Sequence, residues 1–279
     1  MARLAKVLVG DDGTAGARRA VEEATELAAA VGAGVVALRV VGAHDDAGQL
    51  SVELERRCRE TAREHGVDCD CMVVTGDPRD ALLHEVVHVG ADVVVVGDTG
   101  HWTLARPHLG SVAGHLAHHS PRPVVVVPDA ARPLDDGHVV VGIDGSPGSE
   151  AALDWAAEVA SRAGASVIAA HFHDPMADSY PHPPDASEWR THVEPKVRAM
   201  VERLHQPGAD VEVSFRGSHR VEGLLELAGE TDAAMIVVGA RGHASFHRLL
   251  LGGTAIELLH HSDRPVGVVP LGRAEAVAA

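Results

Sequence analysis

The chain has 279 residues, of which 46% are hydrophobic and 3% aromatic, and a formal net charge of −16 at pH 7. This length suits two domains of roughly 140 residues, the apolar content excludes a disordered chain, and the negative charge argues against nucleic acid as a partner. The chain has no apolar run of the ~20 residues that a membrane helix needs, no signal peptide and only three cysteines, so we expect a cytoplasmic protein.

Short valine-rich runs alternate with helical patterns along the first half of the chain. Uninterrupted apolar runs such as Val93 to Val96 are typical of strands buried on both faces of a parallel sheet. Asp77 and Pro78 form a typical helix start, because the carboxylate caps amides and proline suits the first helical position. Strands are expected near residues 5–10, 34–41, 67–74, 91–97 and 123–127, and helices near 15–31, 48–65, 78–89 and 109–119. The alternation predicts a doubly wound α/β fold.

The second half of the chain repeats the first. The segment KVLVGDDGT at Lys6–Thr14 returns as HVVVGIDGS at His138–Ser146, with an offset of 132 residues. The later matches, such as 97 to 239 and 110 to 252, have an offset of 142, so ten residues are inserted between them. We place the insertion in the proline-rich segment His173–Trp189 as a loop. Two domains are therefore expected, residues 1–130 and 138–279, joined by a linker at 128–137.

A glycine pattern follows the predicted fourth strand in each half. Gly97, Gly100, Gly110 and Ser111 precede a helix, whose first amides and dipole favour an anion. Glycine lets the backbone approach phosphate oxygens closely, and the serine can cap the helix or donate to a phosphate. The chain lacks the G-K-[ST] of a P-loop and the G-x-G-x-x-G of a dinucleotide-binding strand. Each glycine alone could be a turn residue, but the repeated spacing favours a binding loop.

These motifs resemble those of the universal stress protein (UspA) family in its tandem two-domain form. Nucleotide-binding members share G-x2-G-x9-G-[ST], which the first half matches in full; in the second half Gly253 stands where Ser or Thr is usual, with Thr254 next. The resemblance implies, in each half, an adenine nucleotide alpha hydrolase-like domain with a five-stranded parallel sheet of order 3-2-1-4-5. Its crevice would lie where strands 1 and 4 end side by side.

The resemblance also implies a ligand and a set of binding residues. The ligand is ATP, with Mg²⁺ as a candidate companion ion, and neither a catalytic residue nor a protein-held metal is expected. Strand-end residues would hold adenine and ribose, and the glycine loops would hold phosphates. The candidates are Gly10, Asp11, Asp12, Val40, Gly97, Gly100, Gly110, Ser111 and Val112 in the first half, and Gly142, Ile143, Asp144, Phe172, Gly239, Gly242, Gly252, Gly253 and Thr254 in the second.

Three functions stay open at this point. The favoured one is an ATP-binding regulator of a stress response. The second is a slow ATP hydrolase or nucleotidyl transferase at the same crevice, although its loop cations form no fixed catalytic pattern. These cations are His101, Arg106, His108, Arg241, His243, His247 and Arg248. The third is a family member without nucleotide that acts through protein contacts.

The repeat also bears on partners and on the two sites. It predicts an intramolecular pseudo-dimer, leaves a homodimer of the whole chain open, and gives no reason to expect nucleic acid or membrane partners. The two sites are expected to be unequal in affinity but both competent, with the second no weaker than the first. Cys69 and Cys71 could form half of a metal site, but two small apolar side chains on a buried strand face are favoured.

Overall fold

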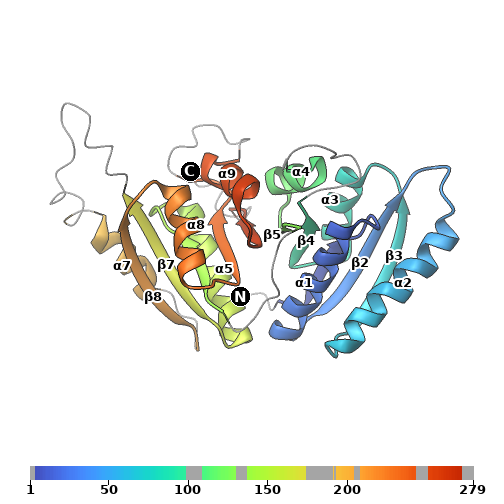
Figure 1. The fold of residues 1–279 in the computed structure, drawn as a ribbon, viewed down its shortest axis with the longest axis horizontal. Coiled ribbons are helices and arrows are strands. Elements are labelled where there is room, and N and C mark those ends of the chain that lie inside the picture. Colours follow the sequence, from blue (N-terminus) through green and yellow to red (C-terminus); the bar gives the residue numbers. More distant parts are fainter. Residues whose placement is uncertain are drawn as a thin grey trace. The chain divides into compact units, whose positions relative to one another are not determined.

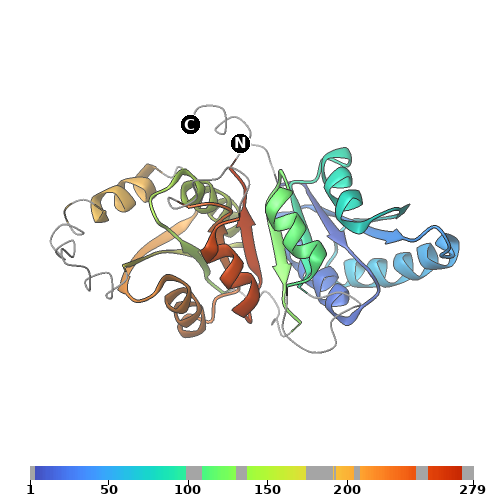
Figure 2. The same cartoon turned by 90° about the horizontal axis from the view of Figure 1, so that it is seen from above.

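The computed structural model of the chain describes residues 4–98, 109–129, 137–173, 191, 193–203, 208–242 and 251–271. The chain forms two compact units, and each is an α/β unit with a parallel sheet (Figures 1 and 2). The limits 1–130 and 138–279 stay a prediction, since residues 130–136 lie outside the described part. Among the described residues, none of the helices combines the length and the apolar character needed to cross a membrane.

The first unit has the predicted strand order. Its strands pair in the order β3-β2-β1-β4-β5, so β1 and β4 are neighbours at the switch point. Helix α1 contacts α2, and α3 contacts α4. The strands are β1 (Lys6–Gly10), β2 (Gly34–Val41), β3 (Cys69–Thr75), β4 (Val93–Gly97) and β5 (Val124–Val127), and the helices are α1 (Ala15–Val31), α2 (Ala47–Glu64), α3 (Pro78–His88) and α4 (Ser111–His119).

The second unit repeats this arrangement in the order β8-β7-β6-β9-β10. The strands are β6 (Val139–Gly142), β7 (Ser166–His173), β8 (Asp210–Gly217), β9 (Met235–Gly239) and β10 (Val266–Val269). The described helices are α5 (Pro147–Ala163), α7 (Glu194–Arg203), α8 (Arg220–Glu230) and α9 (Gly253–His261). Both units therefore confirm the predicted order 3-2-1-4-5.

Strand register places the inserted residues. Val35 of β2 is aligned with Cys69 of β3, and Val167 of β7 is aligned with Val211 of β8. The offset between the units is thus 132 at β2 (35 to 167) and 142 at β3 (69 to 211). The ten extra residues lie between β7 and β8, as predicted. The predicted loop begins at the end of β7, but its residues 174–189 lie outside the described chain.

Local sequence explains why these elements form. Val93, Val94 and Val95 of β4 are fully buried, as expected for a central strand covered on both faces. Asp77 caps α3 by accepting a hydrogen bond from the Arg79 amide at 2.9 Å, with Pro78 in the first turn. The histidine pairs His118–His119 and His260–His261 end α4 and α9, where donor side chains suit exposed carbonyls. The element boundaries agree with the sequence patterns to within about two residues.

Candidate functional site

The glycine loop after the fourth strand is closed in the same way in both units. The Gly110 amide donates to the Asp98 carbonyl at 2.5 Å, and the Gly252 amide donates to the Ala240 carbonyl at 2.8 Å. These bonds hold the starts of α4 and α9 beside the carboxyl ends of β4 and β9. They also occupy the amides of Gly110 and Gly252, so an anion at either helix start would meet the amides that follow these glycines.

Those following amides lie at helix starts. Gly110 is the N-cap of α4, and none of the described side chains caps it. The first amides of an α-helix have no partner within the helix, and the helix dipole adds positive potential there. Ser111 is exposed at this point, whereas Ala113 is buried. The start of α4 can therefore offer backbone donors, and a hydroxyl, to an anion.

In the first unit, a cavity of about 710 Å³ opens at this edge of the sheet. All first-half candidates except Gly100 line it, and Gly100 lies outside the described residues. The lining candidates are Gly10, Asp11, Asp12, Val40, Gly97, Gly110, Ser111 and Val112. Sequence reasoning missed Leu38, Arg39, Asp45, Asp77, Arg79 and Leu82, which also line it.

In the second unit, the equivalent cavity has a volume of only about 100 Å³. Every second-half candidate lines it: Gly142, Ile143, Asp144, Phe172, Gly239, Gly242, Gly252, Gly253 and Thr254. Asp144 reaches across to the glycine loop, because a Cβ placed on Gly242 would collide with its Oδ2. The strand-1 aspartate and the strand-4 loop thus meet, as the sequence predicts.

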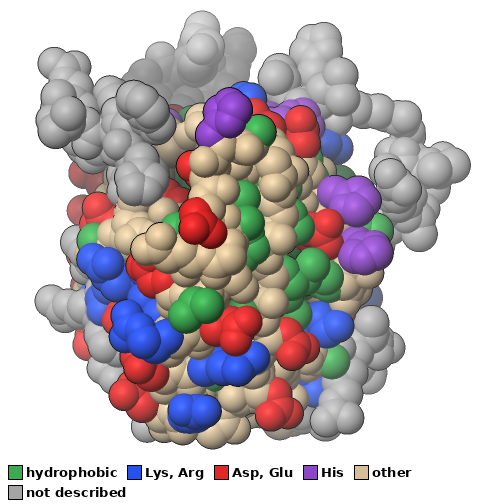
Figure 3. Space-filling view, turned by 90° about the vertical axis from the view of Figure 1, so that its right-hand side faces the viewer, with side chains coloured by type: hydrophobic (Ala, Val, Ile, Leu, Met, Phe, Trp, Pro, Cys, Tyr) green, Lys and Arg blue, Asp and Glu red, His purple; other side chains and the backbone are tan. Residues whose placement is uncertain are grey.

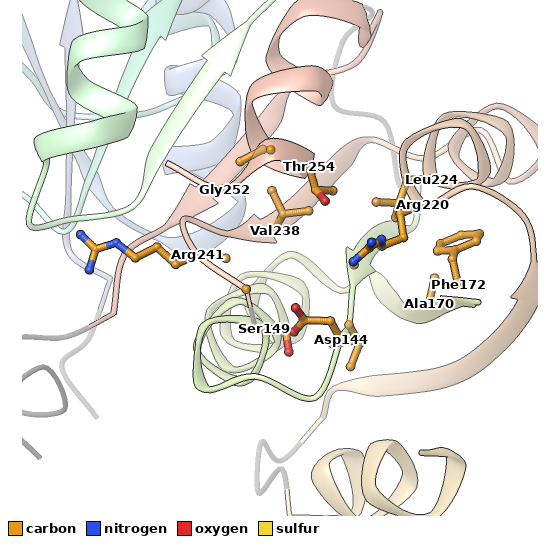
Figure 4. Close-up of a pocket in the computed structure, with 16 residues that line it drawn as sticks. Asp144, Ser149, Ala170, Phe172, Arg220, Leu224, Val238, Arg241, Gly252 and Thr254 are labelled. Carbon is orange, nitrogen blue, oxygen red and sulfur yellow. The ribbon is translucent and has the colours of Figure 1, made fainter. Parts of the chain in front are cut away.

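The arginines around this second cavity differ from the sequence-based expectation. The guanidinium of Arg241 extends away from the other labelled side chains, so only the rest of this residue contributes to the wall (Figure 4). Arg220, at the start of α8, points instead toward the space between Thr254 and Asp144 (Figure 4). Sequence reasoning missed Arg220, whose only signal is a cation three residues after the end of β8. The other loop cations, His101, Arg106, His108, His243, His247 and Arg248, lie outside the described residues.

The Asp11 carboxylate makes its contacts within the protein. Its side chain is fully buried, and Oδ1 accepts hydrogen bonds from the Gly13 amide at 2.7 Å and from Arg39 Nη2 at 3.1 Å. Arg57 of α2 forms an ion pair with Oδ2. The hydrogen bonds and ion pairs of the Asp11 carboxylate therefore lie within the protein, whereas the neighbouring Asp12 is exposed at the cavity.

The second unit replaces this buried charge cluster with neutral residues. Ile143 takes the place of Asp11, and His171 takes the place of Arg39. His171 Nδ1–H donates to the Ile143 carbonyl at 2.7 Å, as Arg39 Nε donates to the Asp11 carbonyl at 3.1 Å. Burial lowers the pKa of His171 below its ordinary 6.5, so the ring is neutral at pH 7. A cation inside the apolar run VVALRVV was the sequence signal for Arg39.

The first glycine of each motif also has a packing role. A Cβ on Gly97 would lie 3.0 Å from the carbonyl carbon and oxygen of Gly16 in α1. A Cβ on Gly239 would lie 2.5 Å from the same atoms of Gly148 in α5. The helix after the first strand can approach the fourth strand this closely only because glycine occupies both positions.

Comparison with known proteins gives matches in both halves of the chain. The model of the universal stress protein family matches residues 4–128 and again residues 137–270. A universal stress protein of Mycolicibacterium smegmatis is 30% identical over 232 residues, 76% of this chain and 78% of that protein. Universal stress protein Rv1996 of Mycobacterium tuberculosis is 33% identical over 196 residues; the match covers 67% of this chain but only 61% of that relative.

Solved structures are similar as well. A universal stress protein from Archaeoglobus fulgidus superimposes with a TM-score of 0.71 at 20% identity, over 96% of this chain and 98% of its own. This likeness supports the fold. A universal stress protein solved in complex with cAMP is 31% identical and covers 46% of this chain and 99% of its own, with a TM-score of 0.40.

Proposed function

Because the chain belongs to the universal stress protein family, we propose that it binds an adenine nucleotide, ATP, and acts as a regulator in a stress response. One observation carries the proposal: the cavity of the first unit joins an exposed carboxylate, Asp12, to the uncapped start of α4. A nucleotide needs an acceptor for its ribose or adenine donors and donors for its phosphates. Asp12 supplies the acceptor at one end of this cavity, and the start of α4 supplies the donors at the other.

The residues of the first unit fit such a ligand. The cavity of about 710 Å³ lies within the ~300–1,000 Å³ of most small-molecule sites. Leu38, Val40 and Leu82 line its wall and suit an adenine ring. The amides of Ser111 and Val112 at the start of α4 suit phosphate oxygens. The described residues contain no cluster of three or more His, Cys, Asp or Glu able to hold a metal, so any Mg²⁺ would arrive with the phosphates.

The two units are proposed to bind unequally, with the first unit the tighter. This ordering departs from the sequence-based expectation, because the second cavity is about 100 Å³ against about 710 Å³. Phe172 stands where the first unit has Val40, and its ring packs against Gly223 of α8. Arg220 stands where the first unit has Pro78, and Arg241 is turned away. The larger side chains leave less room for a base and a ribose.

Valine at the second loop glycine of each unit should remove binding in that unit alone. Gly110 has φ −60° and ψ 149°, a conformation that valine adopts readily, so Gly110→Val is expected to fold. A Cβ on Gly252 would make only ordinary contact, 3.5 Å from the Ala240 carbonyl oxygen. In each variant the branched side chain would occupy the space beside the helix start. Calorimetric titration with ATP should show one site in each variant, and unchanged stoichiometry and affinity would overturn the proposal.

Restoring the missing hydroxyl should strengthen the second unit. A Cβ on Gly253 would meet no described atom within 4 Å, so Gly253→Ser is expected to leave stability unchanged. One hydrogen bond is worth about 0.5–1.5 kcal/mol, which corresponds to an affinity gain of roughly 2- to 13-fold. The gain is measured by ATP titration in the Gly110→Val background, with Gly253→Ala as the control. An equal gain with alanine would show that the hydroxyl is not the cause.

The remaining expectations rest on the family and on the repeat. The intramolecular pseudo-dimer, a cytoplasmic location and the absence of nucleic-acid partners stay predictions. The hydrolase alternative depends on the loop cations, of which only Arg241 lies among the described residues, and its guanidinium is turned away from the second cavity.

A further inference from the structure

Helix α3 carries the segment HEVVH at residues 84–88, which matches the H-E-x-x-H pattern of helical zinc sites. Its two histidines are four residues apart and therefore lie on the same side of the helix. That side faces solvent: the His84 side chain is 71% exposed and His88 is exposed, whereas Leu82 and Val86 are buried. The pattern also occurs in helices that bind no metal, so the geometry of the side chains must decide.

The two imidazole rings are placed as a pair that can share one ion. They are stacked, with an interplanar angle of 18° and ring centroids 5.6 Å apart. Imidazole nitrogens bind Zn²⁺ at ~2.0–2.1 Å, so two rings that share an ion have centroids no more than ~6.5 Å apart. Both side chains are exposed, so their rings can turn toward a shared ion while the backbone of α3 stays in place.

Glu85 holds the His84 ring in the form that a metal ion needs. Nδ1 of His84 lies 2.9 Å from Oε1 of Glu85. An ionised carboxylate only accepts hydrogen bonds, so Nδ1–H donates this one, and Nε2 of the neutral ring keeps its lone pair. Histidines that bind metals are commonly oriented in this way, with the second ring nitrogen bonded to a carboxylate.

The Glu85 carboxylate is itself incompletely partnered. Glu85 is only 9% exposed, and its Oε2 is buried without a hydrogen-bond partner among the described residues. In the same part of the chain, its ion-pair partner is His84. A buried carboxylate is stabilised by a nearby positive charge, and a cation bound to His84 would supply one through the ring.

We propose that His84 and His88 bind a divalent transition-metal ion of the Zn²⁺ class, with Glu85 as the outer carboxylate that orients His84. Imidazole suits Zn²⁺, Cu²⁺ and Ni²⁺ rather than Mg²⁺ or Ca²⁺. Water completes the coordination, because the described residues contain no group of three His, Cys, Asp or Glu side chains able to hold an ion. This site departs from the sequence-based expectation of no protein-held metal.

Glu85 does not take the part that the same pattern gives to glutamate in metalloproteases. There the glutamate acts as general base on a metal-bound water. Glu85 is instead buried and bonded to Nδ1 of His84, the ring nitrogen that does not bind the ion. The site therefore binds a metal ion and does not hydrolyse peptides.

The metal site is separate from the nucleotide cavity and confined to the first unit. Helix α3 lines that cavity with its first turn and Leu82, and neither histidine belongs to the wall. At the offset of 142, Glu226 and Glu230 of α8 take the places of His84 and His88. The proposal is therefore independent of nucleotide binding, and the second unit has no equivalent of the histidine pair.

The surroundings of the site do not repel a cation. The net charge of the chain is −16, and acidic and basic side chains are interspersed on the face shown in Figure 3, where histidine side chains also gather. The arginine of α3, Arg79, is paired with Asp77 at 2.8 Å. A divalent ion can therefore reach the exposed side of this helix.

The test is calorimetric titration of Zn²⁺ into the full chain, without nucleotide and without a polyhistidine tag. The wild type should bind one equivalent of Zn²⁺ more than the double variant His84→Ala/His88→Ala, which is expected to fold because both positions are exposed. Zn²⁺ should also raise the urea midpoint of the wild type more than that of the double variant. Glu85→Gln keeps the shape of the side chain but removes its charge, and it should weaken the extra site about 10-fold.

A second histidine pair supplies the matched control. His115 and His119 of α4 are also four residues apart, with ring centroids 4.5 Å apart, but neither ring is bonded to a carboxylate of the described chain. Changing both to alanine should leave the extra equivalent of Zn²⁺ in place, and its loss there would overturn the proposal.

Two further results would contradict the account of α3. Equal Zn²⁺ stoichiometry and affinity in the wild type and in His84→Ala/His88→Ala would show that the ion binds elsewhere, for example at the half-buried Cys69 and Cys71. Wild-type affinity in Glu85→Gln would overturn the orienting role given to Glu85.

Discussion

Asp11→Ala is expected to destabilise the first unit by about 3–5 kcal/mol. The change removes the carboxylate that pairs with Arg39 and Arg57 and so leaves their positive charges without this compensation. Arg39 is only 4% exposed, and its guanidinium lies 3.1 Å from the Asp11 carboxylate. Arg57 loses its partner on Oδ2 at the same time. Urea unfolding followed by circular dichroism, with hydrogen exchange to assign the loss to the first unit, would measure the effect.

Two control variants define what Asp11 does. Asp12→Ala removes a neighbouring but exposed carboxylate, so its effect on stability should be below about 1 kcal/mol. Asp11→Ile combined with Arg39→His copies the neutral pair of the second unit, where Ile143 and His171 meet, and an added Arg57→Leu removes the other arginine that would lose its partner. This triple variant should recover most of the stability lost in Asp11→Ala. A wild-type unfolding midpoint for Asp11→Ala would show that the buried ion pairs contribute nothing.

Gly239→Ala is expected to destabilise the second unit by about 3 kcal/mol or more, because the added methyl meets backbone rather than a movable side chain. The methyl would lie 2.5 Å from the Gly148 carbonyl, and α5 would have to move away from β9. Gly97→Ala should cost less, because its methyl would lie 3.0 Å from the Gly16 carbonyl.

A matched control comes from the same glycine motif. The position of Gly253 is open, so Gly253→Ala should have no measurable cost. The expected order of destabilisation is therefore Gly239, then Gly97, then Gly253, measured by urea unfolding of the three variants. Equal unfolding midpoints for the three variants would show that helix packing does not require glycine at these positions.

The sequence predicts the elements and their order because the signals are local. Four valines from Val93 specify a doubly buried strand, and Asp77 with Pro78 specifies a helix start, without reference to any distant residue. The internal repeat supplies the rest, since it shows that each half must be a complete unit. The candidate residues converge on two cavities for the same reason: strand ends and helix starts lie on one edge of a parallel sheet.

Long-range contacts explain what the sequence did not predict. Asp11 is bound by Arg39 and Arg57, which are 28 and 46 residues away, and contacted by Cys58, 47 residues away. That meeting depends on how α2 packs against the sheet, which no local pattern reports. The small second cavity likewise reflects the bulk of Phe172 and Arg220, and the direction of Arg241 is not given by any local sequence pattern. Sequence position places a residue at the cavity but does not say where its side chain points.

The most direct measurement is native mass spectrometry of the full chain in saturating ATP, compared with the double variant Gly110→Val/Gly252→Val. Cyclic AMP serves as a second ligand, because it lacks the β- and γ-phosphates that a helix start would bind. We predict two ATP molecules on the wild-type chain, one on each single variant, none on the double variant, and weaker binding of cyclic AMP than of ATP. A double variant that binds ATP like the wild type, or a wild-type chain that binds none, would contradict the account.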